Sequence, residues 1–461
     1  MKNNIDNYII DYSLVEKIKL ENILKYKIVP IYSYDMYILF ASINSVDKNL
    51  LSQLFDYPIK LISITNSEYN NFLLSIKDKI EIYKYSQKAI NMVNKKDNNN
   101  SFINIFLDQL LQLAIKSNTS DIHIEAQKDI LVIRFRINGV LKKVFNFEFE
   151  LYNILSSVIK TLSTMDISLI RLPQNGVFSK TINKLEYDFR VSILPNTYGE
   201  SIVIRILNNK NAKITLNQIG FNKYLHKIIS KNINQTQGLI LVTGPTGSGK
   251  TTTLYSMLNS IDKKRRKIIT IEDPVEYKLE DITQVSVNND IGLTYDLVLK
   301  NVLRQDPDVI LIGEIRDEEA LNIAIQASLT GHLVIATLHT NDAVKTITRL
   351  FDLKAKPYLI ASVLKLVISQ RLYRVLCDCK IEDGKLYKEN GCKKCNYSGY
   401  IKRDIVAQYL QITKQNEEYI KDINNIEKLY DDINIKSLNE YLYEKVLDGT
   451  TSLNEYYKNE I

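Results

Sequence analysis

The sequence lacks any apolar run that approaches the ~20 residues a membrane-spanning helix needs. Its richest apolar stretch, residues 358–369, is short and contains Lys365. Residues 1–21 carry acidic and amide side chains where a secretory signal peptide has its apolar core. We therefore expect the chain to stay in the cytoplasm.

Cysteine and histidine are scarce, with four of each in 461 residues. All the cysteines lie between Cys377 and Cys395, and residues 1–88 contain neither residue type. Because cytoplasmic cysteines seldom form structural disulfides, this grouping favours another use of the thiols. Residues 1–88 offer no catalytic constellation, and we interpret them as a structural or docking module.

A large excess of one charge is also missing. The net charge of +7 is mild, and the 45% apolar and 25% charged fractions are typical of a globular protein. The only dense basic run, residues 263–267, precedes a strand-like segment and resembles a solvated loop. Nucleic-acid binding, which needs a basic face, is not expected.

The length predicts about three domains at ~150 residues each. Residues 1–88 form a predicted small α/β domain, and the polar, low-complexity segment around 94–101 predicts a linker over 89–101. A middle α/β domain is predicted over 102–210. The expected strands of the first domain are 29–32, 36–41 and 60–64, with a helix over 67–76; in the middle domain, helices at 102–116 and 151–165 accompany strands at 120–125, 130–139, 187–193 and 201–207.

Four arginines lie on the predicted strands of the middle domain: Arg134, Arg136, Arg190 and Arg205. Alternation along a strand puts Arg134 and Arg136 on one face. A row of arginines on a sheet is either a solvated surface or an anion-binding surface, and the residues alone do not favour one over the other.

The sequence G-P-T-G-S-G-K-T at 244–251, the phosphate loop, follows a buried apolar run and precedes a helical segment. Its glycines let successive backbone N–H groups point at a phosphate, and the helix N-terminus adds positive potential. Lys250 can reach the outer phosphates of ATP, and the Thr251 hydroxyl can bind Mg²⁺. The predicted nucleotide contacts are Gly244, Pro245, Thr246, Gly247, Ser248, Gly249, Lys250, Thr251 and Thr252.

Three later apolar runs end in polar side chains, at Glu272, Glu314 and His339. Ligands of a doubly wound sheet lie at the carboxyl ends of its strands, so we expect one composite site. Either Glu272 or Glu314 would activate the attacking water while the other holds Mg²⁺ through its water shell. His339 would sense the outer phosphate, and His332 is a predicted cofactor contact. Each carboxylate alone would equally suit a helix cap or a surface charge.

The cysteines form two close pairs, Cys377/Cys379 and Cys392/Cys395, in a segment we assign to residues 374–403. Four thiolates can hold a zinc ion tetrahedrally. The first pair is one residue tighter than the usual C-x-x-C spacing. With no evident open coordination position the zinc would be structural; buried or reactive thiols are the alternative.

Together these segments closely resemble the ATPases of type II secretion and type IV pilus assembly. Beyond the phosphate loop, the matching segments are SDIHIE at 120–125, RFRING at 134–139, RLPQNG at 171–176, LP at 194–195, GE at 199–200, IEDPVE at 271–276, LRQDPD at 303–308, GEIRD at 313–317, TGHLVIATLHT at 330–340, QRL at 370–372 and GCKKCNYSGY at 391–400. KIVP at 27–30 resembles the family's N-terminal docking domain more loosely.

The resemblance implies a RecA-like ATPase core over 211–461, with C-terminal helices, behind a PAS-like α/β middle domain and the docking domain. It implies a ring hexamer that binds ATP between two lobes, with Arg190 and Arg205 as arginine fingers. It also implies a location beside the inner membrane, a polytopic platform protein as partner, and a second partner for the first domain. Retraction motors of the family lack the docking domain and the cysteine element, so this chain resembles an assembly motor.

Some positions depart from the family pattern: Asn175, Lys300 and Glu319 stand where Asp, Arg and Thr are common. None of these removes a catalytic group. A ring-shaped nucleic-acid translocase and a scaffold with an inactive nucleotide site are the rival readings. The sequence leaves open whether the output is secretion, a pilus or DNA uptake.

Overall fold

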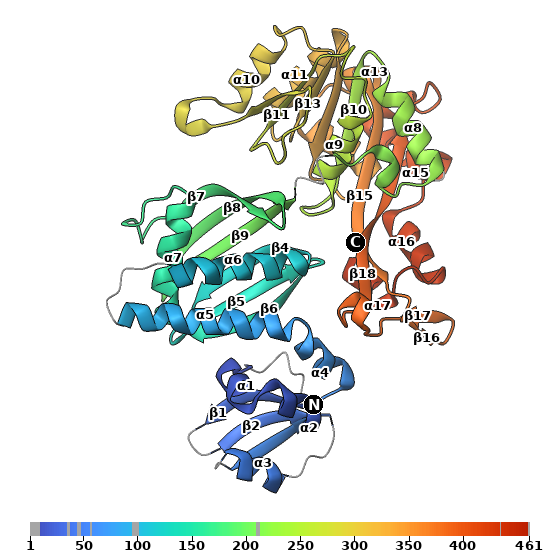
Figure 1. Cartoon of the computed structure of the whole chain (residues 1–461). Helices are drawn as coiled ribbons and strands as arrows, with labels where there is room; N and C mark the ends of the chain where they lie inside the picture. The colour runs from blue at the N-terminus through green and yellow to red at the C-terminus, as the bar shows by residue number, and fades with distance from the viewer. Residues whose placement is uncertain are drawn as a thin grey trace. The chain divides into compact units, whose positions relative to one another are not determined.

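The computed structural model describes residues 10–34, 37–43, 48–55, 58–94, 101–208, 213–433 and 435–459. Two compact units divide the chain (Figure 1): Met1–Asn208 with Asn390–Gly399, and Asn209–Glu389 with Tyr400–Ile461. Within the described residues, no helix is long and apolar enough to cross a membrane.

The first unit begins with a three-stranded sheet of order β1-β2-β3, antiparallel and then parallel. The predicted strands are all present. The predicted helix begins at Asn66, where Thr65 and Glu68 form a reciprocal capping box that satisfies free backbone N–H groups. The elements are α1 (Tyr12–Ile18), α2 (Leu20–Tyr26), β1 (Ile28–Tyr34), β2 (Tyr37–Ser42), α3 (Lys48–Phe55), β3 (Ile59–Ser63) and α4 (Asn66–Leu73).

The expected linker over 89–101 is partly helical. Residues 89–94 are the last turns of the helix α5 (Ile76–Asn94), and residues 95–100 lie outside the described part of the chain. Apolar residues of α1, α5 and the six-stranded sheet that follows belong to one hydrophobic cluster. The domain boundaries at 88 and 101 therefore stay predictions.

A six-stranded antiparallel sheet of order β6-β5-β4-β9-β8-β7 forms the rest of the first unit. Figure 1 shows α5, α6 and α7 on one face of this sheet. Strand alternation explains the packing, since Ile122 and Ile124 are buried while His123 between them is half-buried. Two strands, β6 and β7, had not been predicted. The elements are α6 (Ser101–Lys116), β4 (Thr119–Ala126), β5 (Ile130–Ile137), β6 (Val140–Glu148), α7 (Glu150–Leu162), β7 (Gln174–Ile182), β8 (Leu185–Asn196) and β9 (Gly199–Asn208).

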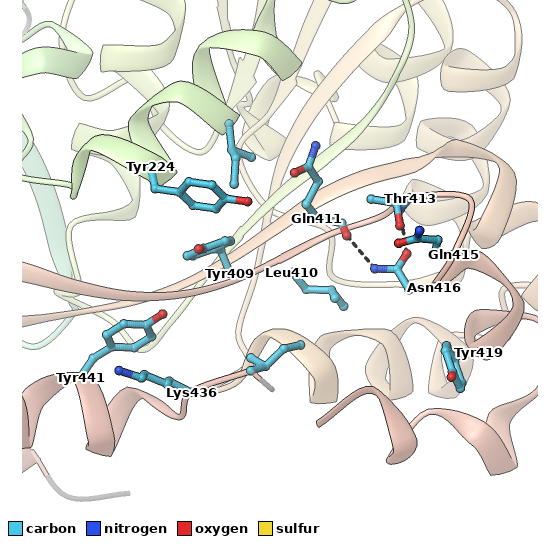
Figure 2. Close-up of a pocket in the computed structure, with 12 residues that line it drawn as sticks. Tyr224, Tyr409, Leu410, Gln411, Thr413, Gln415, Asn416, Tyr419, Lys436 and Tyr441 are labelled. Carbon is cyan, nitrogen blue, oxygen red and sulfur yellow. Dashed lines mark hydrogen bonds between the residues drawn. The ribbon is translucent and has the colours of Figure 1, made fainter. Parts of the chain in front are cut away.

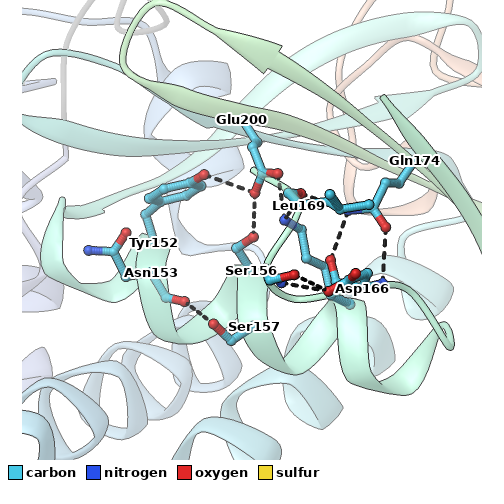
Figure 3. Close-up of polar contacts among 10 residues, drawn as sticks. Tyr152, Asn153, Ser156, Ser157, Asp166, Leu169, Gln174 and Glu200 are labelled. Carbon is cyan, nitrogen blue, oxygen red and sulfur yellow. Dashed lines mark hydrogen bonds and ion pairs between the residues drawn. The ribbon is translucent and has the colours of Figure 1, made fainter. Parts of the chain in front are cut away.

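A buried ion pair joins α7 to the start of β9 (Figure 3). Lys160 and Glu200 are 1% and 2% exposed, and their Nζ and Oε1 atoms lie 2.6 Å apart. Tyr152 and Ser156 donate to the other carboxylate oxygen at 3.1 and 2.7 Å. Lys160 also donates to the Leu169 carbonyl at 3.0 Å, which ties the exposed loop before β7 to the helix.

The second unit contains a seven-stranded sheet of order β12-β11-β13-β14-β10-β15-β18, parallel except at β18. β10 sends Leu239 and Leu241 into one hydrophobic cluster and Ile240 and Val242 into another. A strand buried on both faces is apolar throughout, which is why β10, β11, β13 and β14 were evident in the sequence. The strands are β10 (Gly238–Thr243), β11 (Ile268–Glu272), β12 (Thr283–Ser286), β13 (Val309–Ile312), β14 (Leu333–Leu338), β15 (Leu364–Leu376) and β18 (Tyr400–Gln411), with a separate hairpin of β16 (Ile381–Asp383) and β17 (Leu386–Lys388).

Helices accompany this sheet (Figure 1), several with side-chain caps at their first turns. The C-terminal segment is fastened to β15: Arg374 donates to the Glu455 carboxylate at 2.8 and 2.5 Å, and both side chains are largely buried. The helices are α8 (Lys223–Ile233), α9 (Lys250–Asn259), α10 (Tyr295–Val302), α11 (Glu318–Leu329), α12 (Ala343–Asp352), α13 (Pro357–Val363), α14 (Glu417–Ile420), α15 (Lys428–Ile433), α16 (Leu438–Leu447) and α17 (Leu453–Asn459).

Candidate functional site

The carboxyl ends of four parallel strands meet at one edge of the seven-stranded sheet. Thr243 at the end of β10 pairs with Leu338 at the end of β14. On the other side of β14, Ile312 of β13 pairs with Ala336, and Ile271 of β11 pairs with Ile312. The segments that follow these strands, including the phosphate loop, therefore begin at the same edge.

The phosphate loop contains backbone positions that only glycine suits. Gly247 and Gly249 have φ of +80° and +89°, in the left-handed region. A Cβ on Gly244 would lie 2.5 Å from a backbone oxygen of β15. Gly249 caps the start of α9, so the N-terminus of this helix faces the loop.

The polar side chains of the loop suit an anion. Lys250 donates to the carbonyls of Gly244 and Pro245 at 2.8 and 3.2 Å, across the turn that a phosphate would occupy. Ser248 is buried, and its Oγ has no hydrogen-bond partner among the described residues. Thr251 is half-buried at the start of α9. This donor set fits a polyphosphate with a bound Mg²⁺. The remaining predicted contacts also belong to the loop and the first turn of α9: Thr246 and Gly247 are exposed, and Pro245 and Thr252 are half-buried.

Glu314 lies near Lys250 in an open cluster of charges. Burial lowers the pKa of Lys250, and the Glu314 carboxylate acts in the opposite direction. The carboxylate of Glu314 lies 3.3 Å from Nε2 of His339 and 3.1 Å from Nε of Arg316. Arg316 also reaches Asp273 at 3.4 Å. With its side chain 28% exposed, Glu314 keeps access to water.

Glu272 differs from Glu314 in its surroundings, because its carboxylate is buried and accepts hydrogen bonds from three side chains. It is 5% exposed. Thr270 and Gln284 donate to its Oε1 at 2.6 and 3.2 Å, and the Tyr255 hydroxyl of α9 donates to its Oε2. Burial raises the pKa of Tyr255 most, and the negative charge of Glu272 raises it further. The phenol therefore stays protonated and acts as a donor. Glu272 thus links the end of β11 to the helix that follows the phosphate loop.

Two residues that the sequence did not single out for the site hold the turn at Glu314. The Tyr295 hydroxyl donates to the Ile271 carbonyl at 3.0 Å and accepts from the Glu314 N–H at 3.2 Å. Burial raises the pKa of Tyr295 to about 12, which keeps that proton in place. Thr337 of β14 donates to the Gly313 carbonyl. Tyr295 lies on α10, and nothing in its local sequence marks the contact.

His332 does not reach this edge. It precedes Leu333, which pairs with Gly238 at the start of β10, whereas His339 follows the end of the same strand. A six-residue strand spans ~20 Å, which places His332 at the opposite edge from the phosphate loop. Its Nδ1 lies 3.0 Å from the Ala327 carbonyl and 3.2 Å from Oγ1 of Thr330. The geometry supports a local structural contact there and not the predicted cofactor contact.

The arginines of the first unit form a line across its sheet. Arg190 and Arg205 are cross-strand neighbours, and Asp121 lies opposite Arg205 on the next strand. Arg205 pairs with Asp121 at 2.9 Å, and Arg136 approaches the same carboxylate at 3.6 Å. The Arg205 side chain nevertheless stays 61% exposed. These residues belong to the first unit and the phosphate loop to the second, so their approach to a nucleotide stays a prediction.

The four cysteines come together. Their sulfur atoms lie within 4.8 Å of one another, and this is the one group of potential metal ligands found in the described part of the chain. No disulfide links them. The Cys392 N–H donates to the Cys395 sulfur at 3.3 Å, a bond that stabilises thiolate character. Cys377 and Cys395 are buried, while Cys379 and Cys392 are partly exposed. Four clustered sulfurs fit a structural zinc ion, despite the tight first pair.

A hollow of about 530 Å³ lies elsewhere in the second unit (Figure 2). Its walls include Tyr224, Tyr409 and Tyr441, with Tyr224 facing Tyr409. Gln411, also in the wall, pairs with Leu366 near the start of β15. The phosphate loop lies further along β15, because Thr243, the residue before the loop, pairs with Ser369. The candidate nucleotide site is therefore defined by its side chains and not by this hollow.

Comparison with known proteins identifies relatives over most of the chain. A family model described as Type II/IV secretion system protein matches residues 96–458. Type II secretion system protein E of Aeromonas hydrophila is 43% identical over 370 residues, which are 76% of this chain and 74% of that protein. Type IV pilus assembly ATPase PilB of Myxococcus xanthus is 36% identical over 409 residues, which are 83% of this chain and 72% of that protein.

Solved structures have a similar fold. The pilus retraction motor PilT with bound ADP is 27% identical, with a TM-score of 0.56 over 76% of this chain and 96% of that chain. The ATPase DotB of Legionella pneumophila is 21% identical and matches with a TM-score of 0.61 over 77% of this chain and 95% of that chain. The second likeness concerns the fold alone.

Proposed function

Because this chain belongs to the Type II/IV secretion system protein family, we propose that it hydrolyses ATP to power the assembly of a type IV pilus or a type II secretion pseudopilus. One observation carries the proposal. The phosphate loop, Glu314 and His339 share the carboxyl edge of one sheet, with Lys250 close enough to Glu314 for their charges to interact. A bound triphosphate would have its outer phosphates at this edge.

The loop residues would bind the substrate. Lys250 would leave the carbonyls it now contacts and neutralise charge on the outer phosphates, and the Ser248 hydroxyl would find an acceptor there. Thr251 would hold Mg²⁺, which supplies further charge neutralisation when bound.

Glu314 is the better of the two candidate bases. A base must reach the water whose proton it takes, and Glu314 is partly exposed while Glu272 is buried beneath three donors. We assign Glu272 the positioning of α9 and the loop. His339, which contacts Glu314, would report the state of the outer phosphate to β14.

Arg190 and Arg205 would act as arginine fingers on the transferring phosphoryl group. Arg205 is held by Asp121 through one nitrogen and leaves the rest of its exposed guanidinium available. The line of basic side chains on the sheet supports an anion-binding role for this face.

We further propose the assembly and cellular place that the family suggests. The motor would be a homohexamer in the cytoplasm, peripheral to the inner membrane. It would act on a polytopic platform protein, and the first domain would bind a second membrane component. The four-cysteine element would hold zinc and stabilise the connection between β15 and β18.

A complementation experiment tests the function. A strain lacking the gene would be supplied with the wild-type chain or with Glu314→Gln at matched abundance, and surface fibres and secreted protein would be measured. The proposal predicts output with the wild type and loss with the variant. Output that is unaffected by deleting the gene would contradict it. DNA-stimulated hydrolysis by the wild type would instead favour a nucleic-acid translocase.

A further inference from the structure

Gln370 of β15 lies beside the first residue of the phosphate loop. Ser369 pairs with Thr243, the last residue of β10, so Gln370 is level with Gly244. A Cβ on Gly244 would sit 2.5 Å from the Gln370 carbonyl oxygen. The strand and the loop are therefore in close contact, with no space for a side chain between them.

The side-chain amide of Gln370 joins two parts of the nucleotide site. Gln370 is fully buried. Its Nε2 donates to the Ser248 carbonyl at 2.8 Å, and its Oε1 accepts from the Thr253 hydroxyl of α9 at 3.0 Å. The orientation of the amide follows from chemistry, since the Ser248 carbonyl can only accept. One side chain thus spans the loop and the helix that follows it.

The bond to Ser248 fixes a peptide plane. In a trans peptide the C=O and the next N–H point in opposite directions. With the Ser248 carbonyl turned toward Gln370, the Gly249 N–H is turned away from β15. Gly249 has the positive φ that this arrangement requires. If the donor were absent, the buried carbonyl would lack a partner, and turning it inward would put an oxygen where a phosphate oxygen must bind.

We propose that Gln370 is a positioning residue for nucleotide binding, which presets the Ser248–Gly249 peptide so that the loop presents N–H groups, and not a carbonyl, to the outer phosphates. This inference rests on the proposed ATPase function. A loop that is already ordered before nucleotide binds loses less conformational freedom on binding, and that gain appears as affinity.

Two variants separate positioning from simple stability. Gln370→Met keeps the length of the side chain and removes both bonds. Thr253→Val removes one bond and leaves the contact with Ser248. Both variants are expected to lower the melting temperature, Gln370→Met more than Thr253→Val because it loses two hydrogen bonds and not one. Ser369→Ala is the matched control, because this buried hydroxyl has no partner among the described residues.

The measurement is the dissociation constant of Mg-ADP, by fluorescence competition, beside the melting temperature without nucleotide. We expect Gln370→Met to weaken binding about tenfold or more, and Thr253→Val and Ser369→Ala less than about threefold. If Gln370→Met does not fold, Gln370→Asn, whose shorter amide withdraws from Ser248, takes its place with the same expectation.

Weakening of Mg-ADP binding by the two variants in proportion to their losses in melting temperature would make Gln370 merely structural and overturn the proposal. Unchanged affinity in Gln370→Met would do the same. Failure of the wild-type chain to bind Mg-ADP would instead contradict the proposed ATPase function, so the two failures are distinguishable.

Discussion

Two charged networks in this molecule have similar members and opposite surroundings. In the first unit, Lys160 and Glu200 are at most 2% exposed, and hydroxyls and a carbonyl surround the pair. In the second unit, Glu314, Arg316 and His339 are 28%, 59% and 47% exposed. The first network is closed to solvent, and the second can exchange partners.

This difference separates structure from chemistry. A buried ion pair fixes a conformation and gives a reacting group no access.

 The loop around Leu169 is held in this way, because Lys160 of the buried pair donates to the Leu169 carbonyl. Glu272 resembles the closed network, since it is buried and its carboxylate accepts hydrogen bonds from three side chains. Glu314 belongs to the open one, and we therefore expect the two networks to fail differently when they are broken.

Breaking the closed pair should give the largest effect on stability. Lys160→Met leaves Glu200 buried without its cation, and we expect a loss of about 3–5 kcal/mol in the free energy of unfolding. Denaturant unfolding measures it. The double variant Lys160→Met/Glu200→Gln should recover part of the loss, while hydrolysis per folded molecule stays near the wild-type value. A loss below about 1 kcal/mol would show that the pair does not hold the fold.

Breaking the open network should act on the rate. Glu314→Gln keeps the size of the side chain and removes the base, so hydrolysis should fall about 10²- to 10³-fold while nucleotide binding persists. Steady-state turnover and a binding titration measure the two effects. The control is Glu318→Gln, an exposed carboxylate on α11 that pairs with Lys354 and should change turnover less than about twofold. Full turnover by Glu314→Gln would move the base elsewhere.

Glu272→Gln should show an intermediate pattern. The amide NH₂ of the new glutamine would face hydroxyl groups that donate to the carboxylate in the wild type. We expect this mismatch to cost about 1–3 kcal/mol of stability. Hydrolysis should fall less than in Glu314→Gln. Thermal unfolding and turnover of both variants, measured together, sharpen the contrast. A larger loss of turnover in Glu272→Gln, at an unchanged melting temperature, would reverse the roles assigned to the two carboxylates.

Metal removal should have the smallest effect on the nucleotide site. If the four cysteines hold zinc, the purified chain should contain about one zinc per molecule, and Cys392→Ser should lower that content. Because the element is local, we expect the melting temperature of the ATPase core to fall by only a few degrees. Atomic absorption and calorimetry test both points, and a metal-free protein with four titratable thiols would contradict the zinc assignment.

The predictions that succeeded concern short-range patterns. The strands β10, β11, β13 and β14 are apolar runs because they are buried on both faces, and the residues after them gather at one edge because the strands are parallel. A helix was expected over 67–76, and α4 begins one residue earlier, at Asn66. The clustering of the cysteines also followed from their short separation in sequence.

The features that the sequence did not reveal depend on the three-dimensional fold. His332 and His339 bracket the same strand, and only the pairing of β14 shows that they lie at opposite edges. Gln370 is separated from Ser248 by 122 positions, and Lys160 from Glu200 by 40, so no local pattern announces either contact. The polar composition around residue 94 favoured a linker, yet α5 continues to Asn94.

The most direct test of the account is ATP turnover by the purified wild-type chain and by Lys250→Ala. The account predicts magnesium-dependent hydrolysis by the wild type and a loss of at least about 100-fold in the variant, because the cation that neutralises the outer phosphates is gone while the fold remains. Equal turnover by the two proteins would contradict the claim that the phosphate loop and the edge of the sheet around it form the working site.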